Sequence, residues 1–180
     1  MTHRMIYLVG QPGAGKSTLM HTLLGQFDRV EVNDSLVPHD MLVDRVTGTV
    51  VGAEIGRRRE AFSGTDALAS AIIDKAVPWV LSRPYPLLVA EGARLGNKRF
   101  LETAIEAGYD VTLGLLDHDQ AEEWRAIRSK QLKRTQNESW VTGRRSASRN
   151  LAKAMEGKAR VLTGHPDELR PALAEIIAYG

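Results

Sequence analysis

A run of eight residues near the start of the sequence has the residue types and spacing needed to hold phosphate groups. Residues 10–17 read Gly-Gln-Pro-Gly-Ala-Gly-Lys-Ser and match the pattern G-x-x-x-x-G-K-[ST]. Glycine permits backbone turns that point successive N–H groups at phosphate oxygens. The lysine can contact the β and γ phosphates of ATP, and the serine hydroxyl is a ligand for Mg²⁺. The residues expected to contact the nucleotide are Gly10, Gly13, Ala14, Gly15, Lys16, Ser17 and Thr18.

A second candidate element ends in a carboxylate. Residues 86–90 read Pro-Leu-Leu-Val-Ala and are followed by Glu91 and Gly92. A buried apolar strand that ends in an acid is typical of the element that holds Mg²⁺, directly or through water, beside a phosphate-binding loop. Ser17 and Glu91 are therefore the predicted metal ligands. The alternative is an ordinary glutamate at the end of a strand.

Three consecutive arginines form the third candidate feature. Residues 56–66 are rich in turn-forming residues and contain Arg57, Arg58 and Arg59. Such a set favours the binding of phosphate or substrate, whereas the alternative is a solvated charge cluster. Thr65 or Asp66 can cap the helix predicted over 67–81, and capping does not exclude a second role for Asp66.

The segment from residue 122 to residue 160 is strongly basic. It contains 11 Lys and Arg residues against 4 Asp and Glu residues, in a chain whose formal net charge is +2. A segment of this kind is suited to binding anions. Trp124 and Trp140 are interleaved with its cations, which is compatible with stacking on nucleobases and tracking a phosphate backbone. The alternative for each tryptophan is a packing role.

The elements that must position these residues alternate between strand and helix. Apolar runs predict core strands over 5–9, 29–33, 86–90, 111–116 and 160–162, with helices between them. Two further strands, 41–43 and 49–55, suggest a small inserted hairpin. The pattern predicts an α/β fold with a five-stranded parallel sheet covered on both faces. Asp34 follows the strand at 29–33 and is a candidate ligand contact, because ligands bind at the carboxyl ends of parallel strands; the alternative is a solvated turn aspartate.

Length and composition narrow the class of protein. A chain of 180 residues with 43% hydrophobic and 26% charged residues is typical of one soluble globular domain. It has no cysteine, which excludes disulfides, cysteine nucleophiles and thiolate metal sites. The first predicted strand begins within a few residues of the start, and no apolar run reaches membrane-spanning length. We therefore expect a cytoplasmic protein without a membrane partner.

The layout resembles the P-loop kinases related to adenylate, gluconate and shikimate kinases. The resemblance lies in the glycine loop at 10–17, the insertion at about 38–66, the strand ending at Glu91 and the arginine-rich helical segment before the last strand. It implies the three-layer P-loop fold and a helical lid at about 119–155 that closes over ATP. Arg125 and Arg128 would be lid arginines, and His165, in the segment 163–166, would lie beside the adenine.

A narrower resemblance concerns the acceptor. Residues 56–68, Glu91 with Gly92, and the segment 139–144 are similar to phage-encoded P-loop kinases. Some of these phosphorylate 5-hydroxymethyluracil in DNA on the way to hypermodified bases. This resemblance implies a role in phage DNA modification, DNA as a partner, and a location in the host cytoplasm.

The combined expectation is a phosphotransferase that moves the γ-phosphoryl group of ATP to a hydroxyl of a nucleotide-type acceptor. Lys16, Arg125 and Arg128 would stabilise the transferring group, and Asp66 and Glu91 are the candidates for the base and the metal ligand. The predicted substrate contacts are Asp34, Arg57, Arg58, Arg59, Thr65, Asp66, Arg94 and Arg144. Two alternatives remain: a kinase for a small metabolite or nucleoside monophosphate, and a nucleotide-dependent ATPase or switch.

Overall fold

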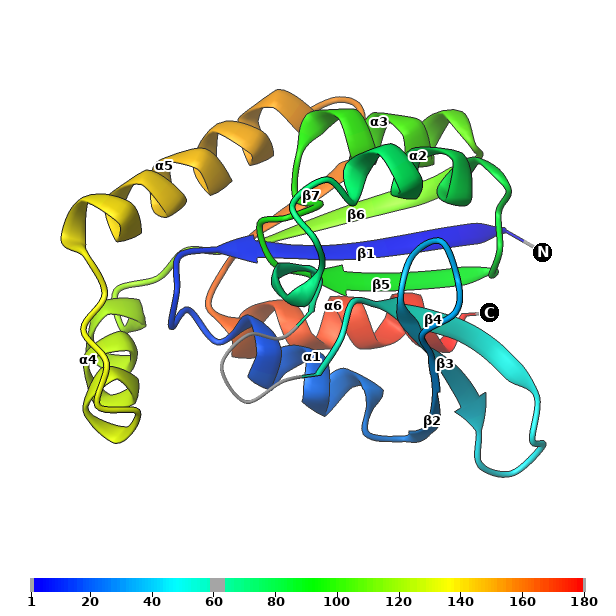
Figure 1. Ribbon diagram of the computed structural model, residues 1–180, viewed down its shortest axis with the longest axis horizontal. Helices are drawn as coiled ribbons and strands as arrows, with labels where there is room; N and C mark the ends of the chain where they lie inside the picture. Colours follow the sequence, from blue (N-terminus) through cyan, green and yellow to red (C-terminus); the bar gives the residue numbers. More distant parts are fainter. Residues whose placement is uncertain (1, 59–63, 180) are drawn as a thin grey trace.

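A computed structural model describes residues 2–58 and 64–179 (Figure 1). The strands are β1 (His3–Gly10), β2 (Phe27–Val32), β3 (His39–Asp44), β4 (Val50–Ile55), β5 (Leu87–Glu91), β6 (Tyr109–Leu116) and β7 (Arg160–Gly164). The α-helices are α1 (Lys16–Leu24), α2 (Ile73–Leu81), α3 (Lys98–Glu106), α4 (Ala121–Gln131), α5 (Glu138–Met155) and α6 (Pro166–Ala178). A short 3₁₀ helix covers Thr65–Ala67.

The described strands form one seven-stranded sheet in the order β2-β3-β4-β5-β1-β6-β7. The five strands from β4 to β7 in that order pair in parallel, while β2 and β3 pair antiparallel at one edge. The sheet therefore has seven strands where five were predicted. Its parallel part does contain five strands, but the strand expected over 29–33 is not one of them. Strand β4 of the predicted hairpin takes that place, because Ala53 and Ile55 are fully buried and pair with β5.

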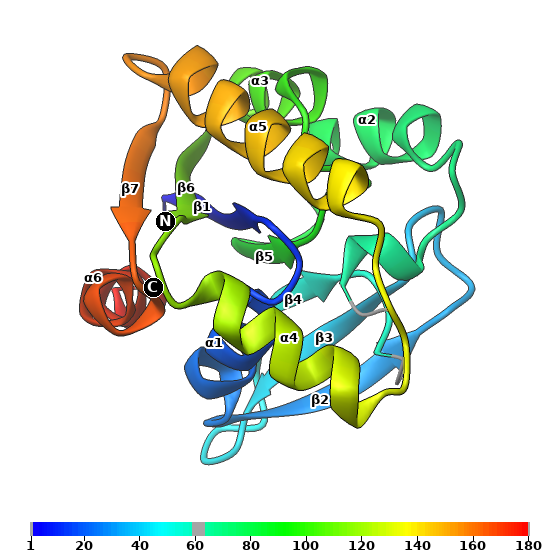
Figure 2. The same ribbon diagram turned by 90° about the vertical axis from the view of Figure 1, so that its left-hand side faces the viewer.

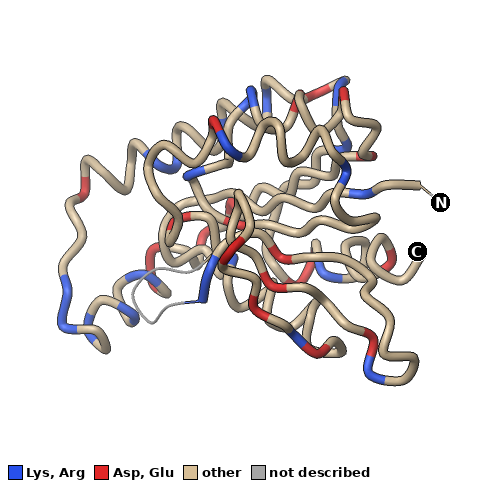
Figure 3. Tube along the Cα trace, turned by 45° about the vertical axis from the view of Figure 1, so that its right-hand side comes forward, with Lys and Arg blue, Asp and Glu red and all other residues tan. Residues whose placement is uncertain are grey.

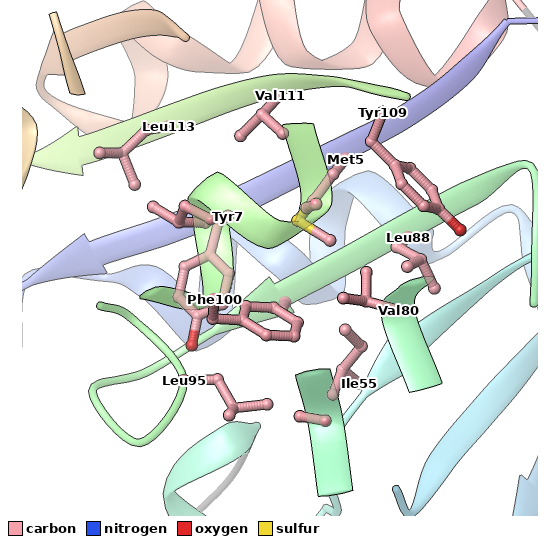
Figure 4. Packing of buried hydrophobic residues seen from close by; sticks show 14 of the residues in the cluster. Met5, Tyr7, Ile55, Val80, Leu88, Leu95, Phe100, Tyr109, Val111 and Leu113 are labelled. Atoms are coloured by element: carbon pink, nitrogen blue, oxygen red, sulfur yellow. The ribbon is translucent and has the colours of Figure 1, made fainter. Parts of the chain in front are cut away.

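Helices cover both faces of the sheet, which confirms the three-layer arrangement. Helices α2, α3 and α5 lie on one face and α1 and α6 on the other (Figures 1 and 2). Side chains alternate along the buried strand β1, so that Met5 and Tyr7 enter the core under α2, α3 and α5 while Ile6 and Leu8 enter the other core. Figure 4 shows Tyr7 against Phe100 in the first of these cores. Strand β1 is thereby fixed from both sides, and the loop that follows it starts from a rigid support.

The helix predicted over 67–81 begins later than expected, at Ile73. The preceding residues form the 3₁₀ helix and turns, and neither Thr65 nor Asp66 caps α2, because both side chains bond to the strand β5 and the turn after it. The segment predicted as a lid, about 119–155, contains α4, a connection at 132–137 and the whole of α5, which the Asn137 side chain caps. The end of α5 packs on the sheet through Leu151 and Met155 and is part of the core, so the name lid is kept for residues 121–145 only. Helix α4 stands to one side of the layers (Figure 1), and Ala121 is its one buried residue among those described. None of the described helices is long and apolar enough to cross a membrane.

Candidate active site

The glycine loop connects β1 to α1 and packs closely against the lid. Gly13 and Gly15 have φ values of 82° and 96°, which side-chain-bearing residues rarely adopt. A Cβ atom at Gly13 would lie 2.8 Å from the Cα of Arg125, and one at Gly15 would lie 3.1 Å from the Trp124 ring and from Pro166. The loop therefore needs glycine both for its turns and for contact with α4 and α6.

Lys16 lies at the first position of α1 and folds back over the loop. Its Nζ donates hydrogen bonds to the carbonyl oxygens of Gly10 (3.0 Å) and Gln11 (2.9 Å). Burial lowers the pKa of Lys16, and the carboxylates of Glu91 and Asp66 oppose that shift. The ammonium is thus held above the loop at the place where a bound phosphate would replace the carbonyl oxygens as its partner.

Ser17 and Glu91 lie together beside the loop. Glu91 is the last residue of β5, which pairs in parallel with β1, and it is 4% exposed. The Ser17 hydroxyl donates a hydrogen bond of 2.7 Å to its Oε1. Two oxygen ligands of this kind fit Mg²⁺, which commonly uses one or two protein ligands and completes its shell with phosphates and water. The described residues hold no cluster of three or more His, Cys, Asp or Glu side chains suited to a metal ion.

Asp66 is held against the turn that follows Glu91. Its Oδ1 accepts hydrogen bonds from the backbone N–H groups of Ala93 (2.8 Å) and Arg94 (3.1 Å). Gly92, with φ of 112°, permits this approach, because a Cβ there would lie 3.0 Å from the Asp66 carboxyl group. The structure therefore brings the two predicted acids, Asp66 and Glu91, to the same turn.

The Thr65 side chain connects the segment before Asp66 to the end of β5. It is fully buried, its hydroxyl donates to the Glu91 carbonyl oxygen (3.0 Å), and its oxygen lies 3.0 Å from the Tyr7 hydroxyl oxygen. Tyr7 in turn donates to the Gly92 carbonyl oxygen (3.0 Å), and burial raises the pKa of Tyr7 well above its usual range. Thr65 therefore positions Glu91 and Asp66. It lines neither the cavity in front of the glycine loop nor the smaller cavity beside the antiparallel strands.

A cavity of about 720 Å³ lies in front of the loop, between the 91–94 turn and the lid. Of the predicted nucleotide contacts in and after the loop, Ala14, Gly15 and Thr18 do not line it. About half of all the residues proposed from the sequence do. They are Gly10, Gly13, Lys16, Ser17, Asp66, Glu91, Arg94, Arg125, Arg128 and Arg144. The lining also includes residues that sequence reasoning did not single out as contacts: Pro12, Ala93, Ser129, Leu132, Arg134, Thr135 and Gln136. Trp140, which is 47% exposed, lines the same cavity. Lys and Arg residues are grouped along α4 and the connection to α5 (Figure 3).

Glu122 joins the glycine loop to both helices of the lid. One of its oxygens accepts hydrogen bonds from Gln11 Nε2 (3.0 Å) and Arg145 Nη2 (2.6 Å), and the other accepts from Arg125 Nη2 (2.8 Å). The Arg125 guanidinium holds the pKa of Glu122 below its usual range. Arg125 also binds Glu138, at the start of α5 (2.7 Å). Sequence reasoning missed this network, since Gln11 and Arg145 lie 111 and 23 residues from Glu122 along the chain.

Several predicted residues lie away from the large cavity. His165 caps α6 and packs against Trp124 and His118, behind the glycine loop, and His118 Nε2 lies 2.9 Å from the Ala14 carbonyl oxygen. Asp34 is exposed in the turn after β2. His165 and Asp34 line neither the large cavity nor the smaller one beside the antiparallel strands. Arg57 and Arg58 line a smaller cavity, and Arg59 lies outside the described residues.

Comparison with known proteins agrees with this geometry. Among curated proteins, none matches the sequence. A family model described as P-loop Nucleotide Kinase3 matches residues 1–178. The match spans the glycine loop, the acidic turn and the lid. With its strand-loop-helix geometry and this near-complete match, the chain belongs to the P-loop Nucleotide Kinase3 family of P-loop kinases.

Proposed function

We propose that the protein is an ATP- and Mg²⁺-dependent kinase that phosphorylates a hydroxyl on a nucleotide-type acceptor, namely the hydroxymethyl group of a modified pyrimidine in DNA. The observation that carries the proposal is the large cavity, which gathers the loop lysine, two carboxylates and several arginines around one space. The family supports nucleotide binding and kinase activity. The acceptor is the one implied by the resemblance of residues 56–68, Glu91 with Gly92, and 139–144 to phage-encoded kinases, and the cations around the cavity are compatible with it.

The triphosphate is assigned to the glycine loop. Backbone N–H groups of the loop and the N-terminus of α1 would bind the phosphates, with Lys16 at the β and γ groups. Ser17 and Glu91 would hold Mg²⁺, which when bound neutralises charge on the β and γ phosphate oxygens. Arg128 lines the cavity from the lid and would face the transferring group.

Asp66 is assigned as the base and Glu91 as the metal ligand. The two backbone N–H groups on Oδ1 fix the orientation of the Asp66 carboxylate, and Oδ2 would take the proton of the acceptor hydroxyl. The acceptor oxygen forms a new bond to the γ phosphorus as the bond from that phosphorus to the β–γ bridging oxygen breaks. ADP leaves with the electron pair of the broken bond.

An acceptor that carries phosphates is favoured by the charge around the cavity. Its lining cations outnumber its carboxylates; Arg144 lies four residues after Trp140 on α5, and Arg134 lies in the connection before that helix. A half-exposed tryptophan beside arginines is suited to a stacked base and a phosphate backbone. Because phosphate contacts release counterions, the affinity for DNA should fall steeply as salt rises from low to moderate concentration.

The proposal is tested by phosphoryl transfer from γ-labelled ATP to a panel of acceptors. The panel contains nucleosides, nucleoside monophosphates, sugars, and DNA with and without 5-hydroxymethyluracil. We expect label only in the hydroxymethylated DNA, and no transfer by Lys16→Ala. Label in a nucleoside monophosphate or a sugar would show that this compound, and not DNA, is the acceptor. ADP formation at the same rate without any acceptor would instead indicate an ATPase or switch.

A further inference from the structure

A smaller cavity of about 180 Å³ adjoins the site on the side of the antiparallel strands. Ser17 and Glu91 line both this cavity and the large one, so the two spaces meet at the predicted metal ligands. The rest of its wall comes from α1, the strands β2, β3 and β4, and the start of the arginine loop. The charged residues of that wall are Arg29, Asp40, Glu54, Arg57 and Arg58.

The floor of the cavity is a partly buried ion cluster. Asp40 on β3 and Glu54 on β4 are directly opposite each other in the strand register, an arrangement that by itself is repulsive. Arg29 on β2 forms ion pairs with both, and each of the three side chains is 13% exposed. Burial lowers the pKa of Arg29 to about 10. Because apolar residues would stabilise such a position at least as well, stability alone does not account for the cluster.

Arg57 adds a donor to the same wall. Its Nε is buried and has no hydrogen-bond partner within the described part of the chain. Arg58 extends over Asp40, with its Nε 3.9 Å from the carboxylate. Guanidinium donors and carboxylate acceptors therefore lie side by side around a narrow space. A ligand that satisfies both needs donors and acceptors of its own.

We propose that this cavity is the slot for the acceptor's base, a flat, uncharged ring of pyrimidine size with N–H and C=O groups along one edge. The proposal rests on the function proposed above. An engineered protein cavity of about 150 Å³ binds benzene, so a space of this size admits one substituted six-membered ring but not a whole nucleotide. The wall holds three carboxylates, Asp40, Glu54 and Glu91, against three arginines. Because Arg29 is already paired with two of those acids, the wall offers a phosphate no net positive charge.

The slot explains how the reacting hydroxyl would reach the γ phosphate. A ring held by Glu54 and Arg57 presents its remaining edge to Ser17 and Glu91, where the two cavities meet. A hydroxymethyl substituent on that edge would enter the space in front of Lys16. The sugar and phosphates of the acceptor would lie outside the slot. The residues that select the nucleobase would then differ from those that bind the DNA backbone.

The test measures binding of the nucleoside 5-hydroxymethyl-2′-deoxyuridine, which has no phosphate, by calorimetry or ligand-observed NMR without ATP. Glu54→Gln keeps the side-chain shape but removes the charged acceptor, and Arg57→Gln removes the donor. Each should weaken nucleoside binding about ten-fold or more, since each removes a charge-assisted hydrogen bond. Arg45→Gln is the matched control, because Arg45 lies in the β3–β4 turn and pairs with the exposed Asp28. It should leave the affinity unchanged.

Several outcomes would overturn the slot: no nucleoside binding to the wild type at millimolar concentration, affinities of both variants within about two-fold of wild type, or displacement of the nucleoside by deoxyribose 5-phosphate. Because Glu54→Gln can disturb the ion cluster, its fold is checked by circular dichroism, and Arg57→Gln, at a partly exposed position, serves as the independent variant. Lys16→Ala should lose ATP binding yet retain the nucleoside. If the slot variants behave as expected but the wild type transfers no phosphoryl group to any acceptor, the proposed function fails while the slot stands.

Discussion

Replacing Asp66 with asparagine separates the chemical role of this residue from its structural role. The carboxylate oxygen Oδ1 accepts two backbone hydrogen bonds, from Ala93 and Arg94. The amide oxygen of asparagine can accept the same two bonds, so the turn after β5 should keep its position. The amide cannot take a proton from an acceptor hydroxyl. Asp66→Asn therefore removes the proposed base and little else.

The expected loss of kcat follows from the removal of the proposed base, and the expected change in stability follows from the two hydrogen bonds. General base catalysis typically contributes 10²–10⁴-fold to a rate, which is roughly 2.7–5.4 kcal/mol of barrier. We expect Asp66→Asn to lower kcat by about that factor. Its free energy of unfolding should change by less than about 1 kcal/mol, because both hydrogen bonds survive. Asp66→Ala loses both bonds and should lower the free energy of unfolding by roughly 1–3 kcal/mol, near the lower end because Asp66 is partly exposed.

The assay combines steady-state phosphoryl transfer, ATP binding and urea unfolding on the wild type and both variants. ATP affinity of Asp66→Asn should remain within about two-fold of wild type, because the loss is in the chemical step and not in nucleotide binding. Asp74→Asn is the matched control, since Asp74 is an exposed aspartate in the first turn of α2, paired with Arg99 of α3, and lines neither cavity. If Asp66→Asn retains kcat within a few-fold of wild type, the base lies elsewhere and the assignment is refuted.

Three further predictions test other parts of the structure. Gly13→Ala should lower the free energy of unfolding by about 1–3 kcal/mol and weaken ATP binding, because the residue has φ of 82° and its Cβ would lie 2.8 Å from the Cα of Arg125; thermal unfolding and ATP titration measure both. Trp140→Ala should weaken the affinity for a DNA acceptor by roughly 1–3 kcal/mol and leave ATP binding unchanged, as measured by fluorescence anisotropy; an unchanged DNA affinity would contradict stacking at this position. The bond from Arg149 lowers the folded-state pKa of Asp117, so this pair stabilises the fold above the ordinary carboxyl pKa of 3.8 and stops doing so as the pH falls through the lower folded-state value. Arg149→Gln should therefore reduce stability at neutral pH and flatten the acid end of the pH–stability curve, and an acid limb of unchanged steepness in chemical unfolding would count against the pair.

Local signals in the sequence were sufficient where the chemistry depends on consecutive residues. The glycine loop is a continuous motif, and its flanking strand and helix follow from apolar spacing over a few residues. Glu91 was identifiable because a short apolar run ends at it. These predictions also place both elements at one edge of the sheet, since parallel strands present their carboxyl ends together. The three-layer class followed from the alternation of strands and helices.

Features that depend on pairing between distant segments were not accessible in this way. Apolar periodicity shows that residues form a strand but does not choose its neighbour, so β2 was placed in the parallel core and β4 in a separate hairpin. The capping role predicted for Thr65 was wrong because the buried Tyr7 hydroxyl and the Glu91 carbonyl oxygen compete for its side chain. The ion cluster around Arg29 is assembled from three strands and has no local signature.

The glycines of the loop connect these two kinds of information. Their first role, freeing backbone N–H groups for phosphate, is readable from the motif. Their second role is the absence of a side chain where α4 passes Gly13 and where Trp124 and Pro166 pass Gly15. A phosphate seated on the loop and a lid seated against it therefore depend on the same backbone. Lys16→Ala leaves both glycines in place, so a defect shared by Gly13→Ala and Gly15→Ala but absent from Lys16→Ala would belong to the loop backbone and its packing against neighbouring helices, and not to the lost ammonium.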